Sequence, residues 1–328
     1  MPSLRPIDEL VIDVLVDNLT DSYSSKPGNV SPEFNNVIAA GAKEISGTTL
    51  CCAQLGLSVL LTATADGKRH KMLFDAGPEG YIFLRNAKNL GANLKDIEAI
   101  GVSHGHWDHM GALLPALDEI TSNGERKVAV HVNPDMFLIR GAQLSNGEVV
   151  PFQIVPSVDE LTARGGEVVN SLEARTLLDD YFYLSGEIPR VSSFEKGRTD
   201  HLGRKSHDAP WTPDPLLMDE RYLAVNIKDK GLLLFSSCSH AGIINVLESA
   251  RNLFDEPIFG VFGGLHLVGS LEKIIPDTVE NLKRFGLKQI VPAHCTGFRA
   301  LYALLHEFGE EIVVPSMVGS RFTYRCDN

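Results

Sequence analysis

The chain has 328 residues, of which 44% are hydrophobic and 22% charged, and its formal net charge is −12. This length is enough for a large core in one or two domains. The negative charge disfavours nucleic acid and anionic membranes as partners, because both are polyanions. No stretch reaches the roughly 18–20 apolar residues that span a bilayer, and acidic residues interrupt the N-terminus, unlike a signal peptide. We therefore expect a soluble, cytoplasmic protein.

The first half of the sequence predicts strands, short turns and two helices. Its apolar, β-branched runs are typical of strands, and they lie at 10–17, 55–63, 71–77, 97–103 and 127–133. Asp66-Gly67, between the second and third runs, is a strong hairpin signal. Apolar residues at helical spacing predict helices at 82–91 and 110–120, the second with Pro115 in its first turns.

The second half follows the same plan. Its expected strands lie at 221–227, 231–237, 257–264, 288–294 and 311–317. Helices are expected at 241–254, 274–286 and 296–309, where apolar residues again recur at helical spacing. Because strands and helices alternate along the chain, we expect an α/β protein with helices layered on sheets.

The stretch at about 140–220 departs from this plan. It is polar, and glycine and proline are scattered through it. A long irregular insertion in a compact domain is usually a lid or a binding loop rather than a spacer. We therefore expect this insertion to form a lid or substrate-binding region.

Four side chains of the kinds that bind metals fall within six positions, in the sequence "HGHWDH" after the strand expected at 97–103. Neutral imidazole binds zinc, iron and manganese, and carboxylate tolerates the same ions. In an extended loop, His104 and His106 can grip one ion, and Asp108 and His109 can reach a second after the chain turns. Burying these groups without a cation between them would be costly, so we expect this loop to bind metal.

The five cysteines do not form a disulfide framework, because their number is odd and their spacing irregular. There is also no CxxC pair of the kind found in structural zinc sites. Most of these thiols are expected to be small buried hydrophobes. Cys238 and Cys295 are exceptions, because each lies within two residues of a histidine.

The "HGHWDH" segment resembles the His-x-His-x-Asp-His pattern of the metallo-β-lactamase superfamily. "FDAG", which ends at Gly77, resembles the Asp-x-Gly that precedes this pattern in the same superfamily. The resemblance implies an αββα four-layer sandwich, formed by residues 1–328 as a single domain that carries the insertion. It also implies a dinuclear metal site at one edge of the two sheets.

Four further segments resemble one branch of that superfamily. It is the branch named for 7,8-dihydropterin-6-methyl-4-(β-D-ribofuranosyl)aminobenzene-5'-phosphate synthase. The segments are "LSGEIPR" (184–190), "SSCSHAGIINV" (236–246), "FGGLHL" (262–267) and "PAHCTG" (292–297). Many members of this branch have no known substrate, so the resemblance does not by itself define an activity.

The resemblance assigns ligands to each of two ions. The first would be held by His104, His106 and a further histidine, for which we choose His240, because it follows a strand and precedes a helix. The second would be held by Asp108, His109 and a distal histidine, which His294 fits. The superfamily usually places a bridging aspartate at the end of a strand such as 231–237.

This chain has Cys238 at that place. Either Cys238 contributes a thiolate, or only His240 reaches the metals and a water bridges them alone; we favour the second. His266 is expected to contact substrate or act as an acid or base, although it could instead be a ligand or simply bond to backbone. Asp75 is expected to orient a ligand imidazole, and Arg190, with Glu187, to contact an anionic substrate. We expect His131, His201 and His207 to be surface or loop residues rather than ligands.

These assignments predict a hydrolase with two divalent metal ions, of which Zn²⁺ is favoured over Mn²⁺ or Fe²⁺. A water shared by the ions would have its pKa lowered to about 7 and would attack an ester, lactone or phosphoester. Asp108 and His266 are the expected catalytic residues. The expected substrate is a small molecule, with an anion allowed, and a homo-oligomer is compatible with the sequence.

Two alternatives stay open. The first is an iron-dependent redox enzyme of the same fold, such as a sulfur dioxygenase or a diiron oxygen reductase. The second is a metal-binding module without catalysis, which would have a closed coordination shell.

Overall fold

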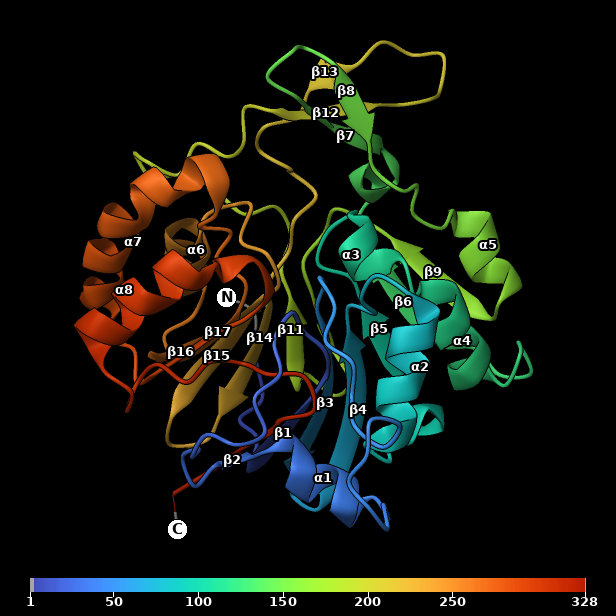
Figure 1. Cartoon of the computed structure of the whole chain (residues 1–328), viewed down its shortest axis with the longest axis vertical. Helices are drawn as coiled ribbons and strands as arrows, with labels where there is room; N and C mark the ends of the chain where they lie inside the picture. The colour runs from blue at the N-terminus through green and yellow to red at the C-terminus, as the bar shows by residue number, and fades with distance from the viewer. Residues whose placement is uncertain (1–2, 328) are drawn as a thin grey trace.

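The computed structural model describes residues 3–327 and shows two large β-sheets packed face to face, with helices on both outer faces (Figure 1). Helices α6 (Ile243–Leu253), α7 (Ile275–Leu282) and α8 (Phe298–Phe308) lie on one side. Helices α2 (Gly80–Asn89) and α4 (Leu113–Thr121) lie on the other. The expected αββα four-layer sandwich is therefore confirmed.

The strands form three sheets. In spatial order, the eight-stranded sheet consists of β2 (Val30–Ser31), β18 (Arg321–Arg325), β1 (Glu9–Val16), β3 (Ser58–Ala65), β4 (Lys68–Phe74), β5 (Ala99–Gly101), β6 (Val128–Val132) and β9 (Gly166–Asn170). In the same sense, the six-stranded sheet consists of β10 (Arg175–Leu177), β11 (Phe182–Leu184), β14 (Leu223–Ile227), β15 (Gly231–Ser236), β16 (Ile258–Gly263) and β17 (Gln289–Pro292). A separate four-stranded sheet consists of β13 (Thr212–Pro213), β12 (His201–Arg204), β7 (Ile139–Gln143) and β8 (Val149–Pro151).

The apolar core has three layers, one between the two large sheets and one under each set of helices. Phe74 of the eight-stranded sheet and Phe235 of the six-stranded sheet belong to the central layer. Phe83 of α2 packs in the layer beneath α2 and α4, and Val246 of α6 in the layer beneath the other helices. Strands β15 and β16, which are covered on both faces, are apolar along almost their whole length rather than alternating.

Most expected elements are found, with differences at their ends. The helix expected at 110–120 is divided into α3 (Trp107–Met110) and α4, and α4 carries Pro115 in its first turn. The prediction of a strand at 311–317 is wrong, because that segment forms only an isolated bridge from Val313 to Ile290. The last strand is instead β18, which pairs with β1 at the opposite end of the chain. Pairing partners this distant in sequence leave no local signal.

The structure divides the 140–220 insertion between the sandwich and a separate layer. Strand β9 extends the eight-stranded sheet, and β10 and β11 extend the six-stranded sheet. Only β7, β8, β12 and β13 form the separate sheet, which lies at the top of Figure 1 above the edge where the two large sheets meet. The remaining short helices are α1 (Glu33–Ala39) and α5 (Val158–Ala163). No helix formed by residues 3–327 has the length and apolar character that crossing a membrane requires.

Parallel pairing brings several loops to one edge of the sandwich. β4, β5 and β6 run parallel, as do β15, β16 and β17. The loops at their carboxyl ends carry four residues with left-handed backbone although none is glycine: Asp75, Ser239, His266 and His294. Such backbone costs about 1–3 kcal/mol per residue and clusters at functional sites, so this edge is where a site is expected.

Gly105 provides a test of how tightly this edge is packed. A Cβ at position 105 would lie 2.0 Å from the carbonyl oxygen of Met136. Gly105→Ala should therefore lower the free energy of unfolding by about 1–3 kcal/mol, as measured by urea denaturation. The control is Gly47→Ala, because a Cβ there meets nothing within 4 Å. Equal effects of the two substitutions would contradict the prediction.

Candidate metal centre

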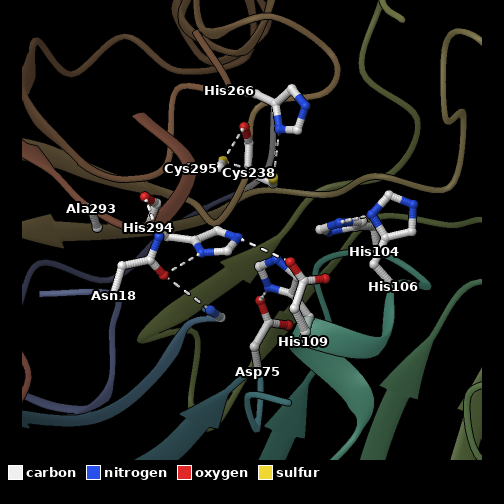
Figure 2. A network of polar contacts seen from close by, with 12 residues as sticks. Asn18, Asp75, His104, His106, His109, Cys238, His266, Ala293, His294 and Cys295 are labelled. Carbon is white, nitrogen blue, oxygen red and sulfur yellow. Dashed lines mark hydrogen bonds and ion pairs between the residues drawn. The ribbon is translucent and has the colours of Figure 1, made fainter. Parts of the chain in front are cut away.

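The loop after β5 carries three buried histidines that form a connected group (Figure 2). His104 Nε2 lies 3.0 Å from His106 Nδ1, and His104 Nδ1 lies 2.9 Å from the Ser103 hydroxyl. The His109 ring is tilted against the His104 ring, with centroids 4.3 Å apart. The sequence motif therefore places its imidazoles together.

Asp75, at the end of β4, fixes this loop from below. Its carboxylate accepts hydrogen bonds from the backbone N–H and the hydroxyl of Ser103, both at 2.7 Å. Its Oδ2 is also 2.8 Å from His109 Nδ1. When His109 donates from Nδ1 to this carboxylate, its Nε2 is left with a free lone pair. This contact is the one that the orienting role expected for Asp75 requires.

Ligand-type side chains from the six-stranded sheet face the same group. Donor atoms of His104, Cys238 and His240 all lie within 4.8 Å of one another, and so do those of His109, Cys238 and His294. Cys238 follows β15 and His294 follows β17, so each group draws on both sheets. The Cys238 sulfur belongs to both groups, and also to a third group with His266 and Cys295.

Unsatisfied nitrogen atoms show that these residues fit a cation. In the described part of the chain, Nε2 of His106, His109 and His240 is buried without any hydrogen-bond partner. A buried polar atom left unpaired costs about 1–3 kcal/mol. Imidazole nitrogen together with thiolate sulfur is a donor set suited to zinc or iron. A metal ion would satisfy these lone pairs.

The protonation states favour metal binding. Burial holds the pKa of His104, His106 and His240 well below its usual range, so these rings are neutral at pH 7. His294 differs: burial lowers its pKa, but the neighbouring Cys295 and Asp108 outweigh burial and raise it to about 9. A metal ion at His294 would therefore have to displace a proton.

Asp108 lies beside the second group of donors. One of its carboxylate oxygens is 3.3 Å from His294 Nε2. Burial raises the pKa of Asp108, but His109 and His294 outweigh burial and hold it below its usual range. Asp108 is therefore an ionised carboxylate next to two imidazoles, where it can accept a hydrogen bond or bind a cation.

His266 lies at the edge of the group and contacts its sulfur. Its ring is 4.2 Å from that of His240, and its Nδ1 is 3.1 Å from Cys238 Sγ. Its Nε2 is 3.4 Å from a guanidinium nitrogen of Arg198. Because arginine only donates, Nε2 must be the acceptor, so the hydrogen is on Nδ1 and points toward the sulfur. This contact holds Cys238 in place.

Arg190 does not reach the centre, contrary to our expectation that it contacts an anionic substrate. Its guanidinium donates to the backbone carbonyls of Ile188, at 2.6 Å, and Leu216, at 2.7 Å. Glu187 is exposed elsewhere on the insertion. Two other cations lie beside the centre: Arg198, which pairs with Asp200 and contacts His266, and Arg140, which donates to the Gly105 carbonyl.

His201 is a residue that sequence reasoning missed. The sequence predicts a surface or loop position, but His201 lies in β12 and is only 1% exposed. Its ring centroid is 4.8 Å from that of His106 and 5.5 Å from that of Phe152. The pairing of β12 with β7 brings His201 against His106. The sequence signal for this position is the imidazole side chain itself.

The other two histidines that the sequence excludes as ligands lie away from the centre. His207 is exposed in a turn, as expected. His131 is not on the surface but is buried in β6, where burial and Arg175 lower its pKa to about 4. Neither belongs to the two groups of donors that share Cys238.

Two consecutive carboxylates of the insertion hold the ligand loops in position. Asp219 accepts a hydrogen bond from the Gly105 backbone N–H at 2.8 Å and pairs with Arg140. Glu220 accepts from the backbone N–H of His240 at 2.8 Å. Adjacent residues thus fix one loop from each sheet, and no motif in the sequence indicates this.

Two large sheets between helices, with buried imidazoles and a thiol gathered at one edge, define a metal-dependent enzyme of the αββα type. The family model described as "Metallo-beta-lactamase superfamily" matches residues 55–175. A curated relative, the 7,8-dihydropterin-6-methyl-4-(beta-D-ribofuranosyl)-aminobenzene-5'-phosphate synthase of Methanocaldococcus jannaschii, is 30% identical over 79% of this chain and 86% of its own. The chain therefore belongs to the metallo-β-lactamase superfamily.

Two other comparisons agree with this assignment. An uncharacterised protein of the same organism is 30% identical over 77% of this chain and 88% of its own. The crystal structure of a metal-dependent hydrolase of the β-lactamase superfamily superposes with a TM-score of 0.70, over 97% of this chain and 100% of that chain. Its sequence identity is 22%, so this likeness concerns the fold alone.

The lowered histidine pKa values predict an acid-sensitive metal-free protein. Below the ordinary histidine pKa of 6.5, the unfolded chain gains protons at five histidines that burial keeps neutral in the folded chain. They are His104, His106, His131, His201 and His240. The free energy of unfolding is therefore fully retained above pH 6.5 and decreases as the pH falls below it. The decrease is at most about 1.4 kcal/mol per histidine for each pH unit. Below 6.5, His294 is protonated in both states and adds no slope.

Urea unfolding of metal-stripped protein between about pH 7 and pH 5 measures this slope. His240→Asn should reduce it, because one of the five histidines with a lowered pKa is removed. His207→Asn, in an exposed turn, should leave it unchanged. If wild type and His240→Asn lose stability equally over this range, the buried histidines are not its cause.

Proposed function

We propose that the protein is a hydrolase that binds two divalent metal ions, with Cys238 as their shared ligand. His104 and His240, with His106 alongside, would complete the ligands of one ion. His109 and His294 would complete the ligands of the other. The observation that carries the proposal is the Cys238 sulfur, which lies within 4.8 Å of the donor atoms of both groups. Zinc is the favoured ion, because imidazole and thiolate are its preferred ligands.

When bound, two such ions would activate a water molecule and polarise the oxygen of the bond to be cleaved. The chain's own groups do the rest of the positioning. Asp108 is ionised and can accept a hydrogen bond from the attacking water. Its contact with His294 and the Asp75 contact to His109 keep both imidazoles facing inward. His266 directs its N–H at the Cys238 sulfur and so supports the thiolate form.

The surroundings favour a small, anionic ester, lactone or phosphoester. Arg198 is the cation nearest to the sulfur side of the centre, and its side chain is 29% exposed. Phe152, which directly follows β8, and His201 of β12 cover the His106 side. A substrate would thus meet a guanidinium on one side and an aromatic wall on the other. The net charge of −12 disfavours nucleic acid as substrate.

A second candidate is a synthase. The relative that is 30% identical over 79% of the chain is named for synthesis of a dihydropterin-linked arylamine phosphate. Formation of that compound by the purified protein, without hydrolysis of simple esters, would favour the synthase over the hydrolase. The same donor set would serve either reaction, because both need an electrophile held beside an activated nucleophile.

Cys238→Ser tests the shared ligand. Removing it should weaken the binding of both ions by more than about 100-fold, since losing a group that merely orients a ligand already costs about 10–100-fold. Equilibrium dialysis with elemental analysis measures the ions bound. With Co²⁺ in place of zinc, the near-ultraviolet thiolate band should also disappear. Cys326→Ser is the control, because Cys326 follows β18 outside the centre.

Retention of two ions and of the thiolate band by Cys238→Ser would contradict the shared ligand. Loss of one ion only would also contradict it, since a ligand to a single ion would then be the correct assignment.

Asp108→Ala tests the hydrolase itself. Across a panel of ester, lactone and phosphodiester substrates, zinc-loaded wild type should show turnover, and Asp108→Ala should reduce kcat by about 100-fold or more. His207→Asn should retain full turnover. Bound iron with dioxygen uptake and no hydrolysis would refute the hydrolase and favour the redox alternative. Full metal content in a protein inert toward every class would indicate a binding module.

A further inference from the structure

Two of the five cysteines touch beside the metal centre. Cys238 Sγ and Cys295 Sγ are 2.9 Å apart, and both side chains are buried, with residue exposures of 2% and 8% (Figure 2). Cys295 also donates from its sulfur to the Cys238 carbonyl oxygen at 3.4 Å. Cys295 adjoins His294 in the chain and forms, with Cys238 and His266, a third group of candidate donors beside the two groups described above.

The two thiols meet because the strand between them ends in glycine. Cys238 follows β15 and Cys295 follows β17, and β16 lies between these strands. Gly264 follows β16 directly, and its N–H bonds to the Ser237 carbonyl at 3.0 Å. A Cβ at position 264 would lie 2.6 Å from Cys295 Sγ. A Cβ there would lie equally close, 2.6 Å, to the Ser237 carbonyl oxygen, so the present packing of Cys295 against this loop requires glycine at position 264.

We propose that Cys238 and Cys295 are a reversible oxidation site that closes to a disulfide in the presence of a hydroperoxide such as hydrogen peroxide. A disulfide is shorter than the present contact by less than about 1 Å, since its sulfur–sulfur bond measures about 2.05 Å. Cys238 lies on a loop and Cys295 in a short 3₁₀ helix (His294–Thr296). Neither is inside a strand, so this movement does not require a sheet to shift.

The reaction balances as a two-electron oxidation. The sulfur of Cys295, the more exposed of the two, attacks one peroxide oxygen, the O–O bond breaks, and one water leaves as Cys295 becomes a sulfenic acid. The sulfur of Cys238 then attacks the Cys295 sulfur. The S–S bond forms, the S–O bond breaks, and a second water carries away the remaining thiol proton. A dithiol reductant reverses the change by thiol–disulfide exchange.

The consequence for the metals rests on the proposed function. A sulfur in a disulfide is no longer a thiolate and cannot serve as the ligand shared by two ions. Oxidation would therefore release metal, and reduction would restore the site. Conversely, ions bound to Cys238 would hold its sulfur and slow the closing of the disulfide.

The experiment treats the metal-free full-length protein with hydrogen peroxide, blocks remaining thiols, and maps non-reduced peptides by mass spectrometry. Wild type should yield a peptide pair joined through Cys238 and Cys295, lighter by two hydrogens than the separate peptides. Cys326→Ser should yield the same pair. Neither Cys295→Ser nor Cys295→Ala should yield this pair. Two substitutions are used so that the test still holds if one of the variants misfolds. Dithiothreitol should remove the cross-link.

A wild-type protein whose Cys238 and Cys295 are both still alkylated after peroxide treatment, or whose Cys295 stops at a sulfinic acid, would overturn the proposal. The zinc-loaded protein separates this result from the proposed function. A cross-link that forms without release of zinc would uphold the oxidation site and refute Cys238 as the shared ligand. A cross-link that forms together with loss of zinc supports both.

Discussion

The structure depends on one electrostatic constraint, the burial of several neutral imidazoles whose outer nitrogens have no partner among residues 3–327. His106, His109 and His240 each carry such a nitrogen, and donor atoms of His109 and His240 lie within 4.8 Å of the Cys238 sulfur. Burial keeps the pKa of His106 and His240 low, so protonation does not relieve the problem at pH 7. A cation is the partner that matches several converging lone pairs at once. The parallel strands, the left-handed loops and the close approach of Gly105 to Met136 all serve to hold these nitrogens where a cation can reach them.

The insertion is part of this arrangement rather than an addition to it. Asp219 and Glu220 are neighbours in sequence, yet one binds the loop of the first sheet and the other the loop of the second. Burial raises the pKa of Glu220 to about 7, although bonds from the backbone N–H groups of Ala241 and His240 lower it. Glu195, also from the insertion, accepts hydrogen bonds from Ile244 and Asn245 at the start of α6. The sandwich alone would leave these backbone donors without an acceptor.

The sequence predicts the parts of this protein in which the signal is local. The four-layer fold, the "HGHWDH" loop and the orienting contact of Asp75 follow from strand patterning and from one dense motif. The errors arise where distant segments meet. His201 escapes prediction because nothing near it indicates a ligand, and only the pairing of β12 with β7 places it against His106. Arg190 carries the expected charge, but neighbouring backbone carbonyls occupy its guanidinium, and Arg198 takes the place beside the centre. Such contacts follow from tertiary packing, which single-residue patterns do not encode.

The division of the donors between two sheets has a consequence for biosynthesis. His104 and His109 belong to the first half of the chain, whereas Cys238, His240 and His294 belong to the second. The first half of the chain emerges from the ribosome before the second half has been synthesised. At that stage the nascent chain carries only part of the set of candidate metal ligands. Full affinity arises when the two sheets dock, which makes metal acquisition a late event of maturation. An ion bound at that stage would join the two layers and oppose their separation, as any ligand selective for the folded state does.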